Sequence, residues 1–243
     1  MKLKELLKNF IEFFDDSMFP EYSCFVCGRE IEGLEYHICD DCKKNLPFID
    51  GHVCSKCGQP ILKGSAYCDN CRSREFVFDE ARAVFEYNEQ TKGTILGVKY
   101  RNEKYLAKFF AKFMFDTLEN WGIDVDVVIP VPTTKTRLKE RGYNQAELMA
   151  NELAKLLEVP ILANAVSKRE NTQKQKELTF KERQENMKGV FSLDKRFILN
   201  FKNILIVDDV FTTGATVNEL SKELRKGNSA KIYVITAAKR LLK

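Results

Sequence analysis

The chain has 243 residues, with 39 Lys and Arg against 35 Asp and Glu, so its formal net charge is +4 at pH 7. This length accommodates one medium domain and one small module. The mild positive charge permits an anionic ligand but does not require nucleic acid as a partner. No segment has the ~18 consecutive apolar residues of a membrane-spanning helix, so the sequence predicts no integral membrane segment.

The first 20 residues predict an amphipathic helix, because their apolar side chains are spaced for one helical face and charges lie between them. These side chains are Leu3, Leu6, Leu7, Phe10 and Phe14. We expect the helix to pack on the body of the protein, with a helix lying on a membrane surface as the alternative. The interspersed charges argue against a signal peptide, so a cytoplasmic, reducing location is expected.

All eight cysteines lie between residues 21 and 75, where they form four Cys-x-x-Cys pairs. In a reducing compartment this pattern favours metal binding over disulfides or redox-active cysteines. Zinc takes four ligands in a tetrahedron, and each Cys-x-x-Cys turn presents two thiolates. The sequence therefore predicts two structural Zn²⁺ sites. The sequential grouping is Cys24, Cys27, Cys39 and Cys42 for one site and Cys54, Cys57, Cys68 and Cys71 for the other.

An internal repeat favours that sequential grouping, although an interleaved grouping stays open. CFVCGREI is followed 30 residues later by CSKCGQPI, and HICDDC has its counterpart in AYCDNC. His37 and His52 each precede a cysteine by two residues, and we expect them to lie beside the sites or on the surface rather than to bind the metal, because thiolates already fill both tetrahedra. Basic residues next to the pairs would allow nucleic-acid contact, with a solvated surface as the alternative.

From residue 76 the sequence alternates between strand and helix patterns, which predicts an α/β fold: a mostly parallel sheet with helices on both faces. The charged segment 167–187 is interpreted as a mobile loop that closes over a ligand, or as a plain disordered loop. The predicted strands are 81–87, 125–131, 189–193, 203–210 and 231–237. The predicted helices are 104–118, 146–157 and 217–225.

The most informative segment is 203–217, NILIVDDVFTTGATV. Its aliphatic run predicts a buried strand that ends at Asp208 and Asp209, and adjacent carboxylates can accept hydrogen bonds from two neighbouring sugar hydroxyls. The turn that follows offers backbone N–H groups and hydroxyls to a phosphate, at the positive end of a predicted helix. Its residues are Thr212, Thr213, Gly214, Ala215 and Thr216. The segment predicts a ribose-phosphate site, with helix caps or surface charges as the alternative.

A second strand, which ends near Pro132, leads into a basic loop. This loop contains Lys135, Arg137, Lys139 and Arg141. A pyrophosphate needs such cations, and Gly142 would allow the backbone to approach it closely. A basic surface loop without a ligand is the alternative.

VDDVFTTGAT resembles the signature of type I phosphoribosyltransferases, which bind 5-phosphoribosyl-1-pyrophosphate (PRPP). IPVPTTKTRLKERGYNQAELMANELA, residues 129–154, is similar to the pyrophosphate-side loop of ComF-type competence proteins, and the four cysteine pairs are similar to their double zinc ribbon. This resemblance implies a type I phosphoribosyltransferase-like fold preceded by a small zinc-ribbon module. It divides the chain into a helix at 1–20, a double zinc ribbon at 21–75 and a transferase-like domain at 76–243.

The resemblance also implies roles for single residues. Asp208 and Asp209 would be the catalytic carboxylates and bind the ribose hydroxyls, while 212–216 would surround the 5-phosphate. The pyrophosphate would be bound by Val131, Pro132, Thr133, Arg141, Gly142, Asn144 and Gln145.

The function implied by the resemblance is PRPP binding with Mg²⁺ and pentosyl transfer to an acceptor that the sequence does not identify, linked to DNA uptake in natural transformation. The alternative is a non-catalytic zinc-ribbon factor that binds single-stranded DNA and carries a ligand-sensing or vestigial phosphoribosyl site. Single-stranded DNA and other competence proteins are the expected macromolecular partners.

Overall fold

The computed structural model describes residues 24, 26–27, 29–31, 38–100, 106–170, 189–197, 199–226 and 229–241. The chain divides into two compact units, Met1–Leu46 and Pro47–Lys243. The predicted helix at 1–20 and residues 171–187 of the predicted mobile loop lie outside the described residues. Within the described ranges, no helix has both the length and the apolar character needed to cross a membrane.

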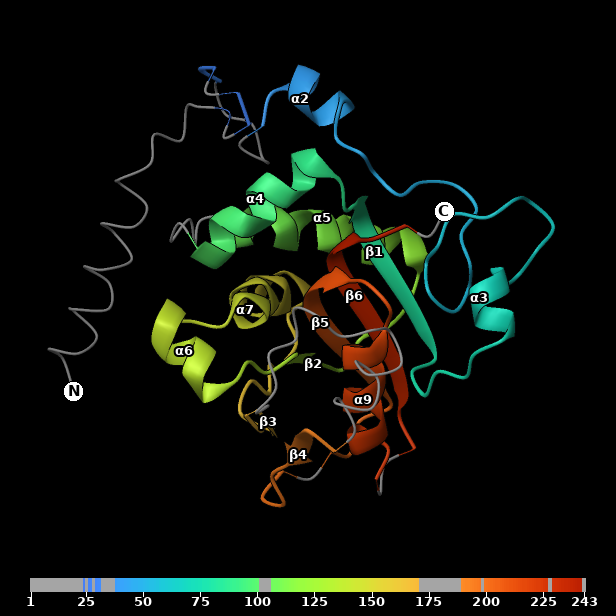
Figure 1. Ribbon diagram of the computed structural model, residues 1–243, viewed down its shortest axis with the longest axis vertical. Coiled ribbons are helices and arrows are strands. Elements are labelled where there is room, and N and C mark those ends of the chain that lie inside the picture. The colour runs from blue at the N-terminus through green and yellow to red at the C-terminus, as the bar shows by residue number, and fades with distance from the viewer. Residues whose placement is uncertain are drawn as a thin grey trace, which may run out of the picture. The chain divides into compact units, whose positions relative to one another are not determined.

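The larger unit is built on a four-stranded sheet whose neighbouring strands all run parallel, in the order β1-β6-β5-β2 (Figure 1). The strands are β1 (Glu80–Glu86), β2 (Val127–Pro130), β5 (Asn203–Phe211) and β6 (Lys231–Lys239). β2 is buried throughout and β6 is buried from its second residue onward. Such continuous burial is typical of a parallel sheet covered on both faces, so the predicted fold class is confirmed.

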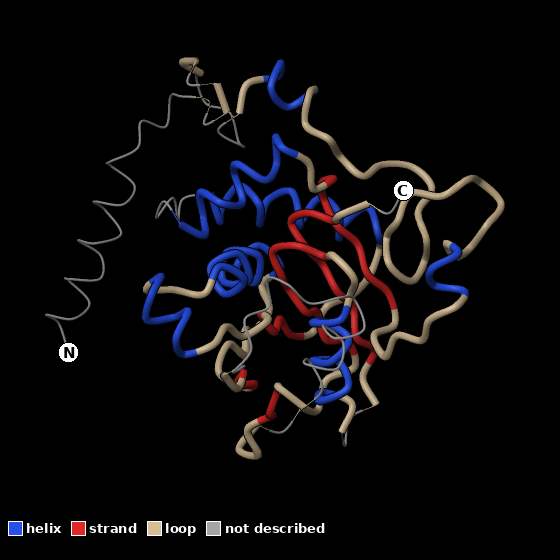
Figure 2. Tube along the Cα trace, viewed as in Figure 1, coloured by secondary structure: helices blue, strands red, loops and turns tan. Residues whose placement is uncertain are grey.

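One face of the sheet is covered by α5 (Leu106–Trp121) and α7 (Gln145–Leu157), which contact each other and the strands (Figure 2). α9 (Ala215–Leu224) packs with the alternate residues Ile204 and Ile206 of β5, whose side chains share the opposite face. These three helices confirm the predicted ones, with boundaries shifted by up to three residues.

Helices α4 and α6 are among those that the sequence did not predict. α4 (Glu89–Tyr100) follows β1, and α6 (Lys135–Arg141) occupies the predicted basic loop. α6 begins where the Thr134 hydroxyl accepts a hydrogen bond from Arg137 N, 3.3 Å away, and it ends at Gly142, which is left-handed. The prediction of a loop was wrong there because α6 buries no residue and so lacks the apolar stripe that predicts a helix.

A small antiparallel pair joins β3 (Val166–Lys168) to β4 (Phe191–Leu193). The first two residues of the predicted mobile loop, Ser167 and Lys168, therefore belong to a strand, and that part of the prediction was wrong. α9 secures this pair, because Glu219 accepts a hydrogen bond from Gly189 N at 2.7 Å and Glu223 accepts one from Leu193 N at 3.1 Å.

The second cysteine tetrad is part of the larger unit. Its ligands Cys54, Cys57 and Cys68 belong to the same buried cluster as Phe78 of the segment before β1 and the α9-side residues of the sheet. Gly58 approaches β1 so closely that a Cβ there would lie 2.9 Å from the carbonyl oxygen of Ala81. The compact units thus divide the chain at 46/47, between the two tetrads, whereas the sequence segmentation places both in residues 21–75.

Candidate functional site

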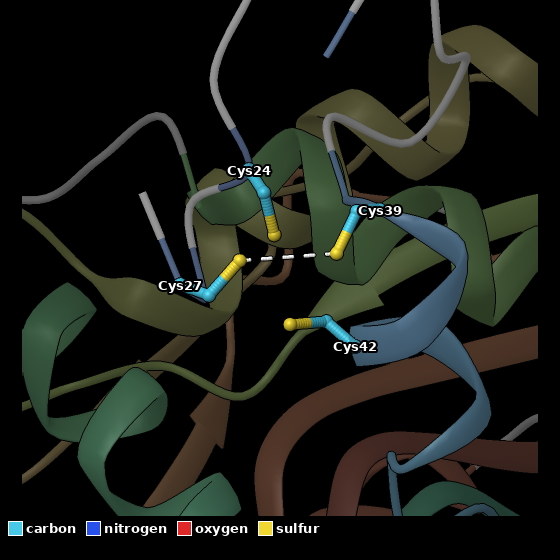
Figure 3. Close-up of side chains that lie close together, drawn as sticks. All are labelled: Cys24, Cys27, Cys39 and Cys42. Carbon is cyan, nitrogen blue, oxygen red and sulfur yellow. Dashed lines mark hydrogen bonds between the residues drawn. The ribbon is translucent and has the colours of Figure 1, made fainter. Parts of the chain in front are cut away.

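Two groups of four thiols have the geometry of zinc centres. In each group the sulfur atoms lie within 4.8 Å of one another, and the grouping follows the sequence: Cys24, Cys27, Cys39, Cys42 and Cys54, Cys57, Cys68, Cys71. Zn–S bonds of about 2.3 Å in a tetrahedron separate the sulfur atoms by about 3.8 Å. The Cys27–Cys39 and Cys57–Cys68 sulfur pairs are 3.8 and 3.7 Å apart. Figure 3 shows the first four thiols pointing toward a common centre. The sulfur separations in both sets fit tetrahedral zinc.

The two halves of the repeat have the same local construction. Cys24 N donates to Arg29 O, and Cys54 N donates to Gln59 O, both at 2.7 Å. The second cysteine pair of each half lies at the start of a short helix, α2 (Asp40–Lys44) or α3 (Asp69–Arg72), with a cysteine as the N-cap. Sequence similarity between the halves therefore corresponds to similar metal-binding loops.

Backbone N–H groups favour the thiolate form in the first cysteine of each half. Burial raises the pKa of the Cys24 thiol, but backbone hydrogen bonds outweigh it and lower that pKa to about 6. The same balance lowers the pKa of Cys54 to about 7. Since zinc binds thiolates, the lowered pKa values favour the form of Cys24 and Cys54 that binds the metal. His52 is not a ligand, because its Nε2 is hydrogen-bonded to Ser65 O at 2.7 Å, and His37 lies outside the described residues.

A cavity of about 280 Å³ opens at the carboxyl ends of β2 and β5, where ligands bind in parallel α/β sheets. Its lining includes residues predicted to bind the pyrophosphate and residues predicted to bind the ribose phosphate: Val131, Pro132, Thr133, Arg141, Asn144, Gln145, Asp208, Asp209 and Thr216. The other lining residues are Arg137, Ala146, Lys168 and Val210. Gly142 ends α6, and residues 212–215 form the turn into α9 without being among the lining residues.

Gly214 determines the conformation of the turn into α9. This residue is the N-cap of α9 with φ +77°, and a Cβ on it would lie 2.7 Å from Phe211 Cζ and 3.0 Å from Phe76 Cε1. Both the backbone angle and the close rings therefore require glycine. Thr213 Oγ1 accepts a hydrogen bond from Ala215 N at 3.3 Å, which is a further tie within the turn. The backbone thus leads from the carboxylates directly to a helix N-terminus.

The opposite wall of the cavity is organised by the start of α7. Asn144 Nδ2 donates to Val131 O at 3.0 Å and so ties the end of β2 to this helix. Arg141 Nη1 donates to Gln145 Oε1 at 3.0 Å. The Gln145 side chain is buried, and its Nε2 has no hydrogen-bond partner among the residues that the structure describes. This amide is available to a ligand oxygen in the cavity.

Lys168 is a charged residue of the cavity lining that the sequence did not predict as part of the site. Burial lowers the pKa of its ammonium, while the carboxylates of Asp208 and, more weakly, Asp209 raise it and Arg137 lowers it. The lysine therefore faces both the acidic pair and a basic neighbour across the cavity. Its charged sequence surroundings resemble a solvent-exposed loop, and only the pairing of β3 with β4 brings it to the site. Arg137 could be predicted as a site residue from the sequence, because it belongs to the basic loop expected to bind pyrophosphate.

Both the cysteine-rich segment and the α/β domain match known protein families. Residues 14–72 match the double zinc ribbon domain, and residues 138–241 match the phosphoribosyl transferase domain. The chain is 30% identical to competence protein F of Haemophilus influenzae over 89% of its own length and 96% of that protein. It is also 30% identical to competence protein ComFC of Bacillus subtilis, over 89% of this chain and 83% of that one.

The chain belongs to the ComF family. A third relative is DNA utilization protein YhgH of Escherichia coli, which is 24% identical over 87% of this chain and 94% of that protein. In this ComF-family chain the double zinc ribbon match includes both tetrads, and the transferase match extends from α6 through β6. The two ribbon tetrads therefore support structural zinc, and the cavity lies in a phosphoribosyltransferase-like domain.

Proposed function

We propose that this ComF-family protein binds PRPP together with Mg²⁺ in the 280 Å³ cavity and transfers the phosphoribosyl group to an acceptor still to be identified. The observation that carries the proposal is the division of charge inside one cavity. Asp208 and Asp209 lie in the last half of β5, which continues to Phe211, while Arg137, Arg141 and Lys168 supply cations to the same cavity. PRPP needs this combination, because its ribose offers hydroxyl donors and its pyrophosphate is an anion.

Each part of the ligand has a matching group. The carboxylates accept hydrogen bonds from the ribose hydroxyls and stabilise the positive charge that develops on the ring as pyrophosphate leaves. The cations neutralise the pyrophosphate, and Gln145 donates through Nε2 to one of its oxygens; the proposal for Gln145 is supported by its position in the cavity lining and by the lack of a partner for Nε2 among the described residues. The 5-phosphate is bound by the 212–216 turn at the start of α9.

Magnesium fits the same donor set, because carboxylate and phosphate oxygens are its preferred ligands. Bound with PRPP beside Asp208 and Asp209, it would supply further neutralisation of the departing pyrophosphate. Water must be kept from the reacting sugar carbon, and the closely packed walls of β2, β5 and α7 contribute to that exclusion.

The test is isothermal titration of the full chain with PRPP, with and without Mg²⁺. Magnesium-dependent binding is expected in the wild type, and Asp208→Asn/Asp209→Asn should abolish it. The matched control is Asp50→Asn/Asp124→Asn, which removes two exposed carboxylates and should bind normally. Normal affinity in the Asp208/Asp209 variant would refute the site assignment.

A second function, binding of single-stranded DNA, is favoured by one exposed aromatic residue on the second ribbon. Tyr67 is 48% exposed, and Lys63 and Arg72 of the same ribbon are exposed as well. Bases stack on exposed aromatic rings beside cations. By contrast, Phe109 and Phe113 of α5 are buried in the core and offer no such platform. The relatives named for competence and DNA utilization support this role in DNA uptake or use.

We expect Tyr67→Ala to weaken single-stranded DNA binding by about 1–3 kcal/mol for a stacked base, whereas Tyr67→Phe keeps the ring and binds normally. Fluorescence anisotropy with a labelled oligonucleotide, measured over a salt series, checks both variants. Wild-type binding should fall steeply with salt. If single-stranded DNA binding changes neither with salt nor with Tyr67→Ala, the surface around Tyr67 is not the DNA-binding site.

A further inference from the structure

One hydrogen bond joins the two basic walls of the cavity. Glu170 Oε1 accepts it from Thr136 N at 2.7 Å, from a residue 34 positions earlier in the chain. Thr136 belongs to α6 and precedes Arg137. Glu170 follows Lys168, the last residue of β3, by two positions. Because Arg137 and Lys168 both line the cavity, Glu170 connects the two segments that bring these cations to it.

Burial contributes little to the position of α6, because none of its residues is buried. Thr136 is the second residue of this helix, where the backbone N–H has no acceptor within the helix. The Glu170 carboxylate is that acceptor, and the Thr136 N–H is the largest influence that lowers the pKa of this carboxyl below its ordinary value. A charged acceptor makes a stronger hydrogen bond than a neutral one. The bond therefore fixes a helix that core packing does not hold.

The strand at the other end of this bond is held on its far side. β3 pairs with β4, and Arg169 N donates to Val190 O at 2.8 Å, so the pairing extends to the residue before Glu170. Lys168 lies opposite Phe191 in this pair, and its Nζ is 5.3 Å from the centroid of that ring. The β4 segment is hydrogen-bonded in turn to two glutamate side chains of α9, and in Figure 1 the strand pair lies between α6 and α9. Loss of the bond would therefore free α6 rather than β3.

The two cations need such a connection because they repel each other. Burial lowers the pKa of the Lys168 ammonium, and the nearby Arg137 lowers it further, as a like charge does. This repulsion favours separation of α6 from β3 before an anion binds. The Glu170 carboxylate offsets part of it, and the hydrogen bond limits the separation. An anion then meets cations that are already in place, so less binding energy is lost in ordering them.

We propose that Glu170 is a positioning residue for pyrophosphate binding. The hydrogen bond that it accepts from Thr136 N fixes the span of the cavity between Arg137 and Lys168. The turn at 212–216 and the carboxylates of β5 are not part of this connection, so the effect is confined to the pyrophosphate end of the ligand. The role in ligand binding rests on the proposed function, whereas the attachment of α6 to β3 does not.

The test uses the full chain and three variants. Glu170→Ala removes the acceptor, and Glu170→Gln keeps an oxygen acceptor without its charge. The matched control is Glu140→Ala, which removes another exposed carboxylate, on α6 itself. Both alanine variants make the surroundings of the cavity more positive by one charge, which by itself favours an anion. Weaker pyrophosphate binding in Glu170→Ala alone therefore reports the lost bond and not the changed charge.

Titration calorimetry with inorganic pyrophosphate and, separately, with ribose 5-phosphate measures the two ends of the cavity. We expect Glu170→Ala to weaken pyrophosphate binding by about 2–10-fold, the range for one lost hydrogen bond, and to leave ribose 5-phosphate binding unchanged. Glu170→Gln should recover part of the pyrophosphate affinity, and Glu140→Ala should bind pyrophosphate at least as tightly as the wild type. Hydrogen–deuterium exchange of 133–141, measured without ligand, should rise in Glu170→Ala and stay at the wild-type rate in Glu140→Ala.

Wild-type exchange and wild-type pyrophosphate affinity in Glu170→Ala would overturn the proposal. Raised exchange with unchanged pyrophosphate affinity would overturn it as well, because the bond would then stabilise α6 without positioning its cations. Equal losses for pyrophosphate and ribose 5-phosphate would contradict an effect confined to one end of the ligand. A wild type that binds neither ligand refutes the proposed function and the role in binding that rests on it, while the exchange of 133–141 still decides whether Glu170 fixes α6.

Discussion

Replacing Gly214 with alanine should destabilise the protein at the turn between β5 and α9. Two costs follow from the structure. At φ +77° an L-residue is strained by about 1–2 kcal/mol relative to glycine. In addition, the new Cβ would lie 2.7 Å from Phe211 Cζ and 3.0 Å from Phe76 Cε1, and overpacking of this kind costs about 1–3 kcal/mol. Together these predict a loss of about 2–5 kcal/mol in the free energy of unfolding.

The control is Gly51→Ala. Gly51 has the same φ of +77°, but a Cβ there would meet no atom within 4 Å. It should therefore show only the backbone cost of about 1–2 kcal/mol, and the difference between the variants measures the contact with the two rings. Both are measured by urea denaturation followed through Trp121, the only tryptophan, which packs against Tyr233 in the larger unit.

Equal losses of unfolding free energy in the two variants would show that the Phe211 and Phe76 rings move aside without an energetic cost. That result would refute the steric argument. Wild-type stability in Gly214→Ala would refute the backbone argument as well. Phosphate binding by the turn adds a second readout, because the same shift of Phe211 would displace backbone N–H groups of 212–216. Gly214→Ala should accordingly weaken PRPP binding beyond what Gly51→Ala does.

Two further predictions follow from single contacts. Burial lowers the pKa of Lys168, so the ammonium loses its charge at a lower pH than an ordinary lysine, whose pKa is 10.5. The affinity of the protein for inorganic pyrophosphate should therefore fall as pH rises toward 10.5, and Lys168→Arg should keep its affinity to higher pH. Titration calorimetry over a pH series checks both expectations. Asp79 accepts hydrogen bonds from Ile232 N at 2.7 Å and Arg225 Nη2 at 2.6 Å, so Asp79→Ala should cost about 1–3 kcal/mol in urea denaturation, against about 0.5 kcal/mol or less for Asp124→Ala. A pH-independent affinity, or equal losses in the two Asp variants, would contradict the respective prediction.

The sequence by itself determined the features that depend on local patterns. The aliphatic run Ile204–Val207 predicts a buried strand in a parallel sheet, and the carboxylates that follow it are then expected at the carboxyl ends of the strands, where ligands bind. Four Cys-x-x-Cys turns likewise specify metal ligands through spacing alone. Helices α5, α7 and α9 were predictable because each has an apolar stripe.

α6 was missed for the converse reason. It buries no side chain, so its only sequence signals are the capping Thr134 and the terminating Gly142. α4 likewise escaped prediction, because its amphipathic pattern is weak. Without an apolar stripe, local sequence says little about whether a segment is helical.

Only the tertiary structure decided which distant residues share a site. Lys168 reaches the acidic pair because β3 pairs with β4, and no local pattern encodes that pairing. Lys239 lies two residues beyond the predicted strand 231–237, yet it is buried at the end of β6 against the Phe211 ring. Charges and rings act over distances set by packing rather than by sequence separation, so the placement of these two lysines could be known only from the fold.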